Sequence, residues 1–240
     1  KILSLPVNQS IWGLLIVLFI AMVVVSQFML TFGSDPNAKI TKKSKSPLSF
    51  HPIALIFGLL SFVSYLVEGA VGDWSALYLF EDKGILIEEA VMGVMLFNGT
   101  MCIGRLLGNR LGKHLTSKQV VVGGYLLGSI AMGLIVFLPG HASMYTYLLL
   151  GISLAMIVPN LFSAMGEQNV IPMTQAVATS TMLGYMGILM GPALIGFIAH
   201  GTSLTVAFIV LTTLLVVSAG IGKYAYHLMS KDCGLSEEQI

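Results

Sequence analysis

Residues 52–80 read PIALIFGLLSFVSYLVEGAVGDWSALYLF, and this stretch decides the fold. Its only charged side chains are Glu68 and Asp73, and the rest is apolar, small or weakly polar. A helix rises 1.5 Å per residue, so about 20 such residues cross a hydrocarbon core of about 30 Å. The stretch therefore predicts a membrane-spanning helix.

Six further stretches share this character, and turn residues separate several of them. They cover residues 10–32, 90–109, 118–138, 143–166, 174–199 and 203–228. Across the chain 56% of residues are hydrophobic and only 10% are charged, against about 25% charged in soluble domains. The sequence thus predicts an all-α, polytopic transmembrane helix bundle with seven spans, whose main partner is the lipid bilayer.

The basic residues indicate how the spans are oriented. Ten lie on one side: Lys39, Lys42, Lys43, Lys45, Arg105, Arg110, Lys113, Lys118, Lys223 and Lys231. Only Lys1 and Lys83 lie on the other side. Because short cytoplasmic loops are enriched in Lys and Arg, loop 33–51 and the C-terminus are expected to be cytoplasmic. The net charge of +1 gives no reason to expect a nucleic-acid partner.

One long polar connection divides the chain. Residues 33–51 are expected to be a cytoplasmic linker between a single helix, 1–32, and a six-helix bundle, 52–228. Residues 229–240 are expected to form a cytoplasmic tail.

Glu68 is the leading candidate for a functional residue, because acids inside a bilayer are costly and are usually retained for a role. Helical spacing places it on one face with four small or polar residues, Ser61, Ser64, Gly72 and Ser75. This stripe is expected to face the bundle interior or a water cavity. Two interpretations remain open: a proton-titratable or solute-contacting carboxylate, or a structural acid that is hydrogen-bonded to a neighbouring helix.

Amides mark two other spans. Asn98 shares a helix face with Arg105, and Asn160 follows Pro159, which is expected to kink its helix by removing a backbone donor. Such amides often bridge helices, and kinked helices with a polar face often line cavities, so both roles stay open.

The span 174–199 is rich in glycine. Gly184, Gly187 and Gly191 lie on one face, with Pro192 beside them, and this small-residue spacing favours close helix packing. Tyr185 lies off that face and is expected to point into a cavity.

The spans show no sign of enzyme chemistry. They contain no metal-spaced His or Cys pair, no nucleophile elbow and no phosphate loop, so neither a metal nor a cofactor is expected. A transporter and a seven-helix receptor or sensor remain as alternatives. Against the receptor alternative, no span of this sequence contains a lysine suited to carry a retinal Schiff base.

Residues 104–115 read GRLLGNRLGKHL. Through Asn109, Arg110, Gly112, Lys113 and His114, this stretch resembles the cytoplasmic loop motif of the major facilitator superfamily. Asn109 stands where the motif has an acid, and Arg105 stands where the motif begins with glycine. Three more stretches, EGAVGDWSALYL (68–79), VPNLFSAMG (158–166) and GYMGILMGPALIGFIAH (184–200), are similar to the bacterial YbjJ-like, fucose-permease-like branch.

This resemblance implies twelve helices, of which the chain would supply the sixth to the twelfth. It would then lack the N-terminal bundle of the same protein and sit in the bacterial inner membrane. The resemblance implies a secondary transporter for a small polar solute, with a proton as candidate co-substrate. The spans that would line its cavity carry Tyr65, Glu68, Asn98, Asn160 and Tyr185. Arg105 is grouped with the loop motif as a gating residue.

Overall fold

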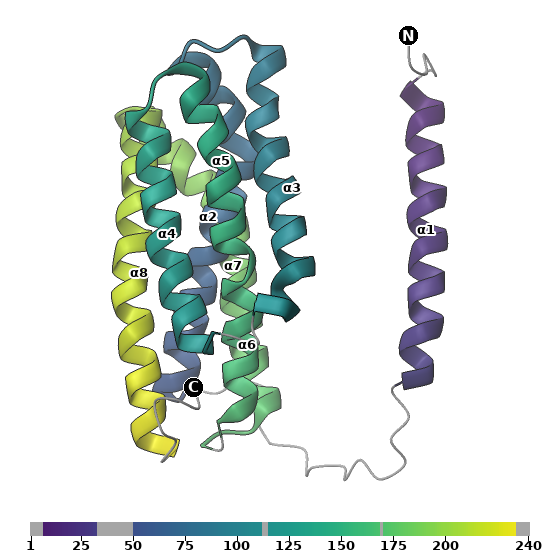
Figure 1. Ribbon diagram of the computed structural model, residues 1–240, viewed down its shortest axis with the longest axis vertical. Coiled ribbons are helices and arrows are strands. Elements are labelled where there is room, and N and C mark those ends of the chain that lie inside the picture. Colours follow the sequence, from purple (N-terminus) through teal and green to yellow (C-terminus); the bar gives the residue numbers. More distant parts are fainter. Residues whose placement is uncertain (1–6, 33–49, 112–114, 169, 234–240) are drawn as a thin grey trace. The chain divides into compact units, whose positions relative to one another are not determined.

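A computed structural model describes residues 7–32, 50–111, 115–168 and 170–233. It divides into two compact units, Lys1–Ser44 and Lys45–Ile240. The first unit contains one helix, α1 (Val7–Phe32). The second contains the helical bundle shown in Figure 1.

The bundle consists of helices throughout its described part. They are α2 (Pro52–Glu81), α3 (Ile87–Leu111), α4 (Ser117–Phe137), α5 (Gly140–Ala155), α6 (Ile157–Glu167), α7 (Met173–Gly201) and α8 (Leu204–Cys233). Among the described residues, six helical stretches are long and apolar enough to cross a membrane, and α5 and α6 together form one of them. The all-α membrane bundle predicted from the sequence is therefore confirmed.

The count of six differs from the seven predicted spans because of α1. This helix covers the first predicted span, but its described apolar stretch, Leu15–Gln27, is shorter than a full crossing.

The break between α5 and α6 falls at Met156, one turn before Pro159. Proline has no backbone N–H, so the helix loses a hydrogen bond one turn back. The Asn160 backbone N–H and side-chain amide both donate to the Met156 carbonyl, at 3.2 and 2.8 Å. Asn160 thus satisfies a carbonyl at the kink, which agrees with the kink expected from Pro159.

Helix α2 is the central element of the bundle, and it packs most extensively against α7 and also contacts α3 and α8. Figure 1 shows α8 and α3 on opposite sides of the bundle. Large side chains from several helices fill the core between them, including Phe57, Phe97, Tyr125, Tyr147 and Phe208. In the core, the Tyr125 hydroxyl donates to the Leu60 carbonyl at 2.7 Å and lies 2.8 Å from the Ser64 hydroxyl.

Candidate functional site: an ion pair on the polar face of the bundle

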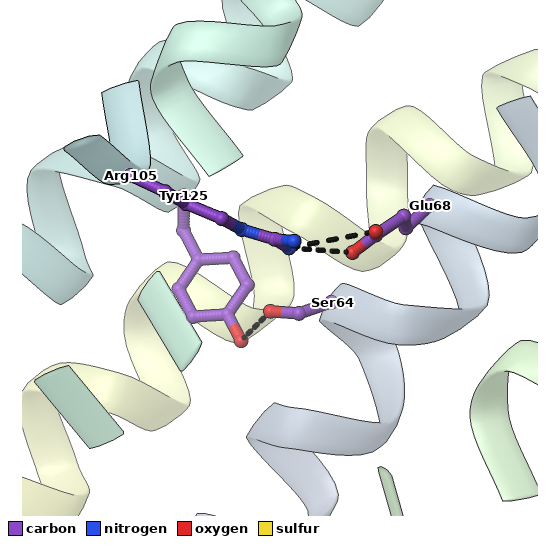
Figure 2. Close-up of polar contacts among 4 residues, drawn as sticks. All are labelled: Ser64, Glu68, Arg105 and Tyr125. Atoms are coloured by element: carbon purple, nitrogen blue, oxygen red, sulfur yellow. Dashed lines mark hydrogen bonds and ion pairs between the residues drawn. The ribbon is translucent and has the colours of Figure 1, made fainter. Parts of the chain in front are cut away.

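The centre of the site is an ion pair between α2 and α3. The Arg105 Nη2 donates to both carboxylate oxygens of Glu68, at 3.1 and 3.4 Å. Figure 2 shows the guanidinium directed at this carboxylate. The side chains are 43% and 22% exposed, respectively, so the pair lies at the surface of this bundle. Within the membrane each charge lowers the cost of burying the other.

The packing of α3 explains why Arg105 faces outward. Gly104 and Gly108 turn towards the α5–α6 connection, where an added Cβ at Gly104 would lie 2.6 Å from Ala155. Gly151 of α5 makes an equally close approach to Phe97. With one face committed to this contact, Asn98, Cys102 and Arg105 share a neighbouring, exposed face of α3.

Two tyrosines, one from α2 and one from α7, form a stacked pair near the ion pair. Tyr65, one turn before Glu68, stacks on Tyr185 of α7 with ring centroids 6.0 Å apart and an interplanar angle of 9°. The Tyr185 side chain is 58% exposed. The rings form a flat aromatic surface next to a carboxylate and a guanidinium.

The predicted polar stripe of α2 is divided in the structure. Ser61, Ser64 and Ser75 are buried against other helices, whereas Glu68 is half-buried and Gly72 is exposed. Ser61 donates to the Phe57 carbonyl at 3.0 Å within its own helix. The three serines therefore pack in the protein interior, and within this stripe only Glu68 brings a charge to the outer face.

The other predicted residues are placed differently. Asn98 donates to the Val94 carbonyl at 3.0 Å, and Asn160 serves the kink at Met156. Among the described residues, no hydrogen bond joins either amide to Glu68. Asn109 and Arg110 belong to α3, but their side chains fall outside the described part, as do Gly112 and Lys113 entirely.

The glycine face of α7 lies directly on α2. A Cβ at Gly191 would be 2.5 Å from the Leu66 carbonyl oxygen, one at Gly184 would be 2.8 Å from Tyr65, and one at Gly187 would clash with the Phe62 carbonyl. On α2, a Cβ at Gly69 would be 2.8 Å from the Ile188 carbonyl oxygen of α7. This carbonyl accepts no helical hydrogen bond from residue 192, because Pro192 has no backbone N–H. The Trp74 indole N–H donates to the Pro192 carbonyl at 3.0 Å. The close approach of α7 to α2 brings Tyr185 and Tyr65 to stacking distance.

The sequence does not predict the pairing of Arg105 with Glu68. The family resemblance assigns Arg105 to the loop motif, because it stands at the beginning of that stretch. Its position inside the predicted span 90–109 was the available signal, since charged residues inside membranes usually pair with one another. In the described part of the chain, no group of three or more His, Cys, Asp or Glu side chains is arranged to hold a metal ion.

No family model matches the chain. An uncharacterized MFS-type transporter of Yersinia pestis is 41% identical over 168 residues, which cover 69% of this chain and 43% of that protein. Membrane protein MosC of Rhizobium meliloti is 30% identical over 170 residues, covering 70% of this chain and 42% of MosC. The chain thus spans less than half the length of these curated relatives.

The fold has a counterpart among solved structures. The crystal structure of the Escherichia coli fucose:proton symporter superposes with a TM-score of 0.63 at 16% identity, over 72% of this chain and 42% of the symporter. At this identity the match concerns the fold alone, and the sequence relatives carry the assignment. Together with the six membrane-crossing stretches, they show that this integral, multi-pass membrane protein belongs to the major facilitator superfamily.

Proposed function

We propose that the chain is the C-terminal half of a secondary active transporter, which moves a small polar solute across the membrane by alternating access. Its relatives of similar sequence are more than twice as long as the matched region, so the rest of such a protein would supply the opposing bundle. The two bundles would rock about a site near the membrane midplane. The names of the relatives favour transport over the receptor alternative and over catalysis.

The Glu68–Arg105 ion pair is the observation that carries this proposal. It lies on membrane-spanning helices and on an exposed face, where a bundle in contact with lipid would not place two charges. A facing bundle with a water-filled cavity between them gives these charges a suitable environment. The polar face would then be the wall of the solute pathway.

The chemistry of this wall suits a small hydroxylated or zwitterionic solute. The carboxylate accepts hydrogen bonds, the guanidinium donates them in a fixed fork, and the Tyr65–Tyr185 rings offer a flat apolar surface. Tyr65, Glu68, Arg105 and Tyr185 are therefore the proposed contact residues. Asn98, on the Arg105 face of α3, extends this wall, whereas Asn160 is proposed to position the kinked helix.

A proton is the proposed co-substrate. Protonation of Glu68 would remove the negative partner of Arg105, and the guanidinium would then be available to the solute or to the opposing bundle. Solute binding and protonation would thus favour the same rearrangement of one ion pair. This is the differential interaction that coupling between two ligands requires.

We place the protein in a bacterial inner membrane, with loop 33–51 and the C-terminus in the cytoplasm. The uneven distribution of Lys and Arg supports this orientation. The loop stretch that includes Asn109, Arg110, Gly112 and Lys113 would then lie at the cytoplasmic surface and take part in gating between the bundles.

Uptake into proteoliposomes tests the proposed function. The intact protein is reconstituted with an internal pH-sensitive dye and presented with a panel of neutral sugars and amino acids, beginning with L-fucose. We expect one class of solute to drive proton entry. Glu68→Gln should reduce this flux at least about tenfold, because a glutamine amide cannot take up and release the coupled proton.

Asp73→Asn is the matched control, because it makes the same acid-to-amide change on the same helix at an exposed position. It should retain the wild-type flux. A Glu68→Gln variant with an unchanged rate and unchanged pH dependence would exclude the proposed role of the pair.

A further inference from the structure

A groove lies between the beginning of α4 and the last third of α8. It has a volume of about 640 Å³, and its lining includes Lys118 from α4 and Lys223 from α8. The Lys223 side chain is exposed, and that of Lys118 is half-buried. Both lysines stand at the polar end of the groove, and no acidic residue is among its lining in the described part of the chain.

The lining changes in character along α4. Thr116, Lys118 and Gln119 stand at its start, and Val122, Gly123 and Leu126 follow about one to two turns further on. At 1.5 Å per residue the groove extends roughly 15 Å from the helix start into the apolar part of the span. Its order of charged, polar and apolar groups matches a molecule with an anionic head and a hydrocarbon chain.

The polar end also offers hydrogen-bond donors. A capping box fixes Thr116 and Gln119: the Gln119 backbone N–H donates to the Thr116 hydroxyl oxygen at 3.3 Å, and the Thr116 N–H donates to the Gln119 side-chain oxygen at 3.1 Å. The oxygens serve the cap, so the Thr116 hydroxyl proton and the Gln119 amide N–H groups remain as donors. Phosphate oxygens accept from such groups.

The apolar end is open to the membrane. A Cβ at Gly123 would meet nothing within 4 Å, and the neighbouring Leu126 is 47% exposed. The exposed residues further along this side of α4 and α8 are large and apolar, among them Ile130, Val216 and Val217. Charged residues of the ion-pair face are absent from this surface, which identifies it as the lipid-facing side.

We propose that this groove binds one anionic phospholipid, with the phosphate between Lys118 and Lys223 and an acyl chain along Val122, Gly123 and Leu126. Basic pockets between membrane helices at the cytoplasmic surface bind lipid headgroups in this way. The two lysines lie on the side expected to be cytoplasmic. The inference is independent of the transported solute and of the Glu68–Arg105 pair.

Native mass spectrometry of the intact protein in mild detergent tests this proposal. Phosphatidylglycerol and phosphatidylcholine with identical acyl chains are titrated separately. We expect one phosphatidylglycerol to be retained in preference to phosphatidylcholine. Removing both charges in K118Q/K223Q should weaken phosphatidylglycerol binding roughly 30-fold, because each lysine near an anionic surface is worth about a factor of five.

Two matched variants separate the parts of the site. K42Q/K43Q removes the same charge from the linker on the same expected side and should bind like wild type. Gly123→Leu fills the groove without altering charge, and it should reduce retention because its side chain would occupy the acyl-chain path. Inorganic phosphate at equal concentration should not displace the lipid.

Three results would overturn the proposal. These are equal retention of the two lipids, equal loss of binding in K118Q/K223Q and K42Q/K43Q, and displacement by inorganic phosphate. The last would show a small-anion site in place of a lipid site.

Discussion

At the residue scale, the proposed function depends on two side chains, Glu68 and Arg105. They belong to neighbouring helices, and a single guanidinium nitrogen reaches both carboxylate oxygens. Removing one partner leaves the other charge unpaired inside the membrane region, whereas removing both leaves none. The energetics of the single and double variants should therefore differ.

A double-mutant cycle in detergent measures this difference. We expect Glu68→Gln and Arg105→Gln each to lower the free energy of unfolding, and the double variant to lower it by less than the sum. The expected coupling is about 0.5–3 kcal/mol, the range for residues that share an ion pair. Additive losses would show that the pair contributes nothing to stability beyond its separate groups.

At the element scale, the contact between α2 and α7 determines how the aromatic part of the site is built. Three glycines on one face of α7 bring its backbone onto the carbonyls of Phe62 and Leu66, and the Tyr65–Tyr185 stack lies along the same seam. Small residues at such spacing let two membrane helices approach closely.

Gly191→Ala tests this contact. The new Cβ would lie 2.5 Å from the Leu66 carbonyl oxygen, so the helices must separate. We expect a loss of about 1–3 kcal/mol, typical of overpacking, in unfolding measurements. Gly220→Ala in α8 is the control, because its Cβ would meet nothing within 4 Å. It should be neutral or slightly stabilising, and equal losses in both variants would contradict the account.

Most of the helices could be predicted from the sequence, because long apolar runs and turn residues are local signals. The break at Met156 also followed from Pro159. The sequence predicts less well which neighbouring helix each side chain contacts. The stripe from Ser61 to Ser75 spans an arc of α2 wide enough to meet two environments, so Ser64 bonds Tyr125 in the core while Glu68 meets Arg105 at the surface. Helical periodicity gives a residue's face, but the neighbouring helices decide what that face meets.

At the scale of the whole molecule, the bundle has two kinds of exposed surface. One carries apolar side chains such as Ile130 and Val216, and the other carries Arg105, Glu68 and Tyr185. If lipid surrounded the bundle on all sides, the charged side chains of the second surface would face hydrocarbon at a high energetic cost. The central claim is that this polar face lines a water-filled pathway completed by a second bundle.

The reactivity of Cys102 tests this claim most directly and needs no knowledge of the solute. Cys102 is a free, exposed thiol on the α3 face that carries Asn98 and Arg105. In a Cys233→Ser background, a charged, membrane-impermeant thiol reagent should modify it in the intact membrane protein, because thiolates form and react in water. Leu127→Cys, in a background without Cys102 and Cys233, is the control at comparable depth on the lipid-facing side of α4. The account predicts modification of Cys102 and protection of the cysteine at 127, whereas equal protection of both thiols would contradict it.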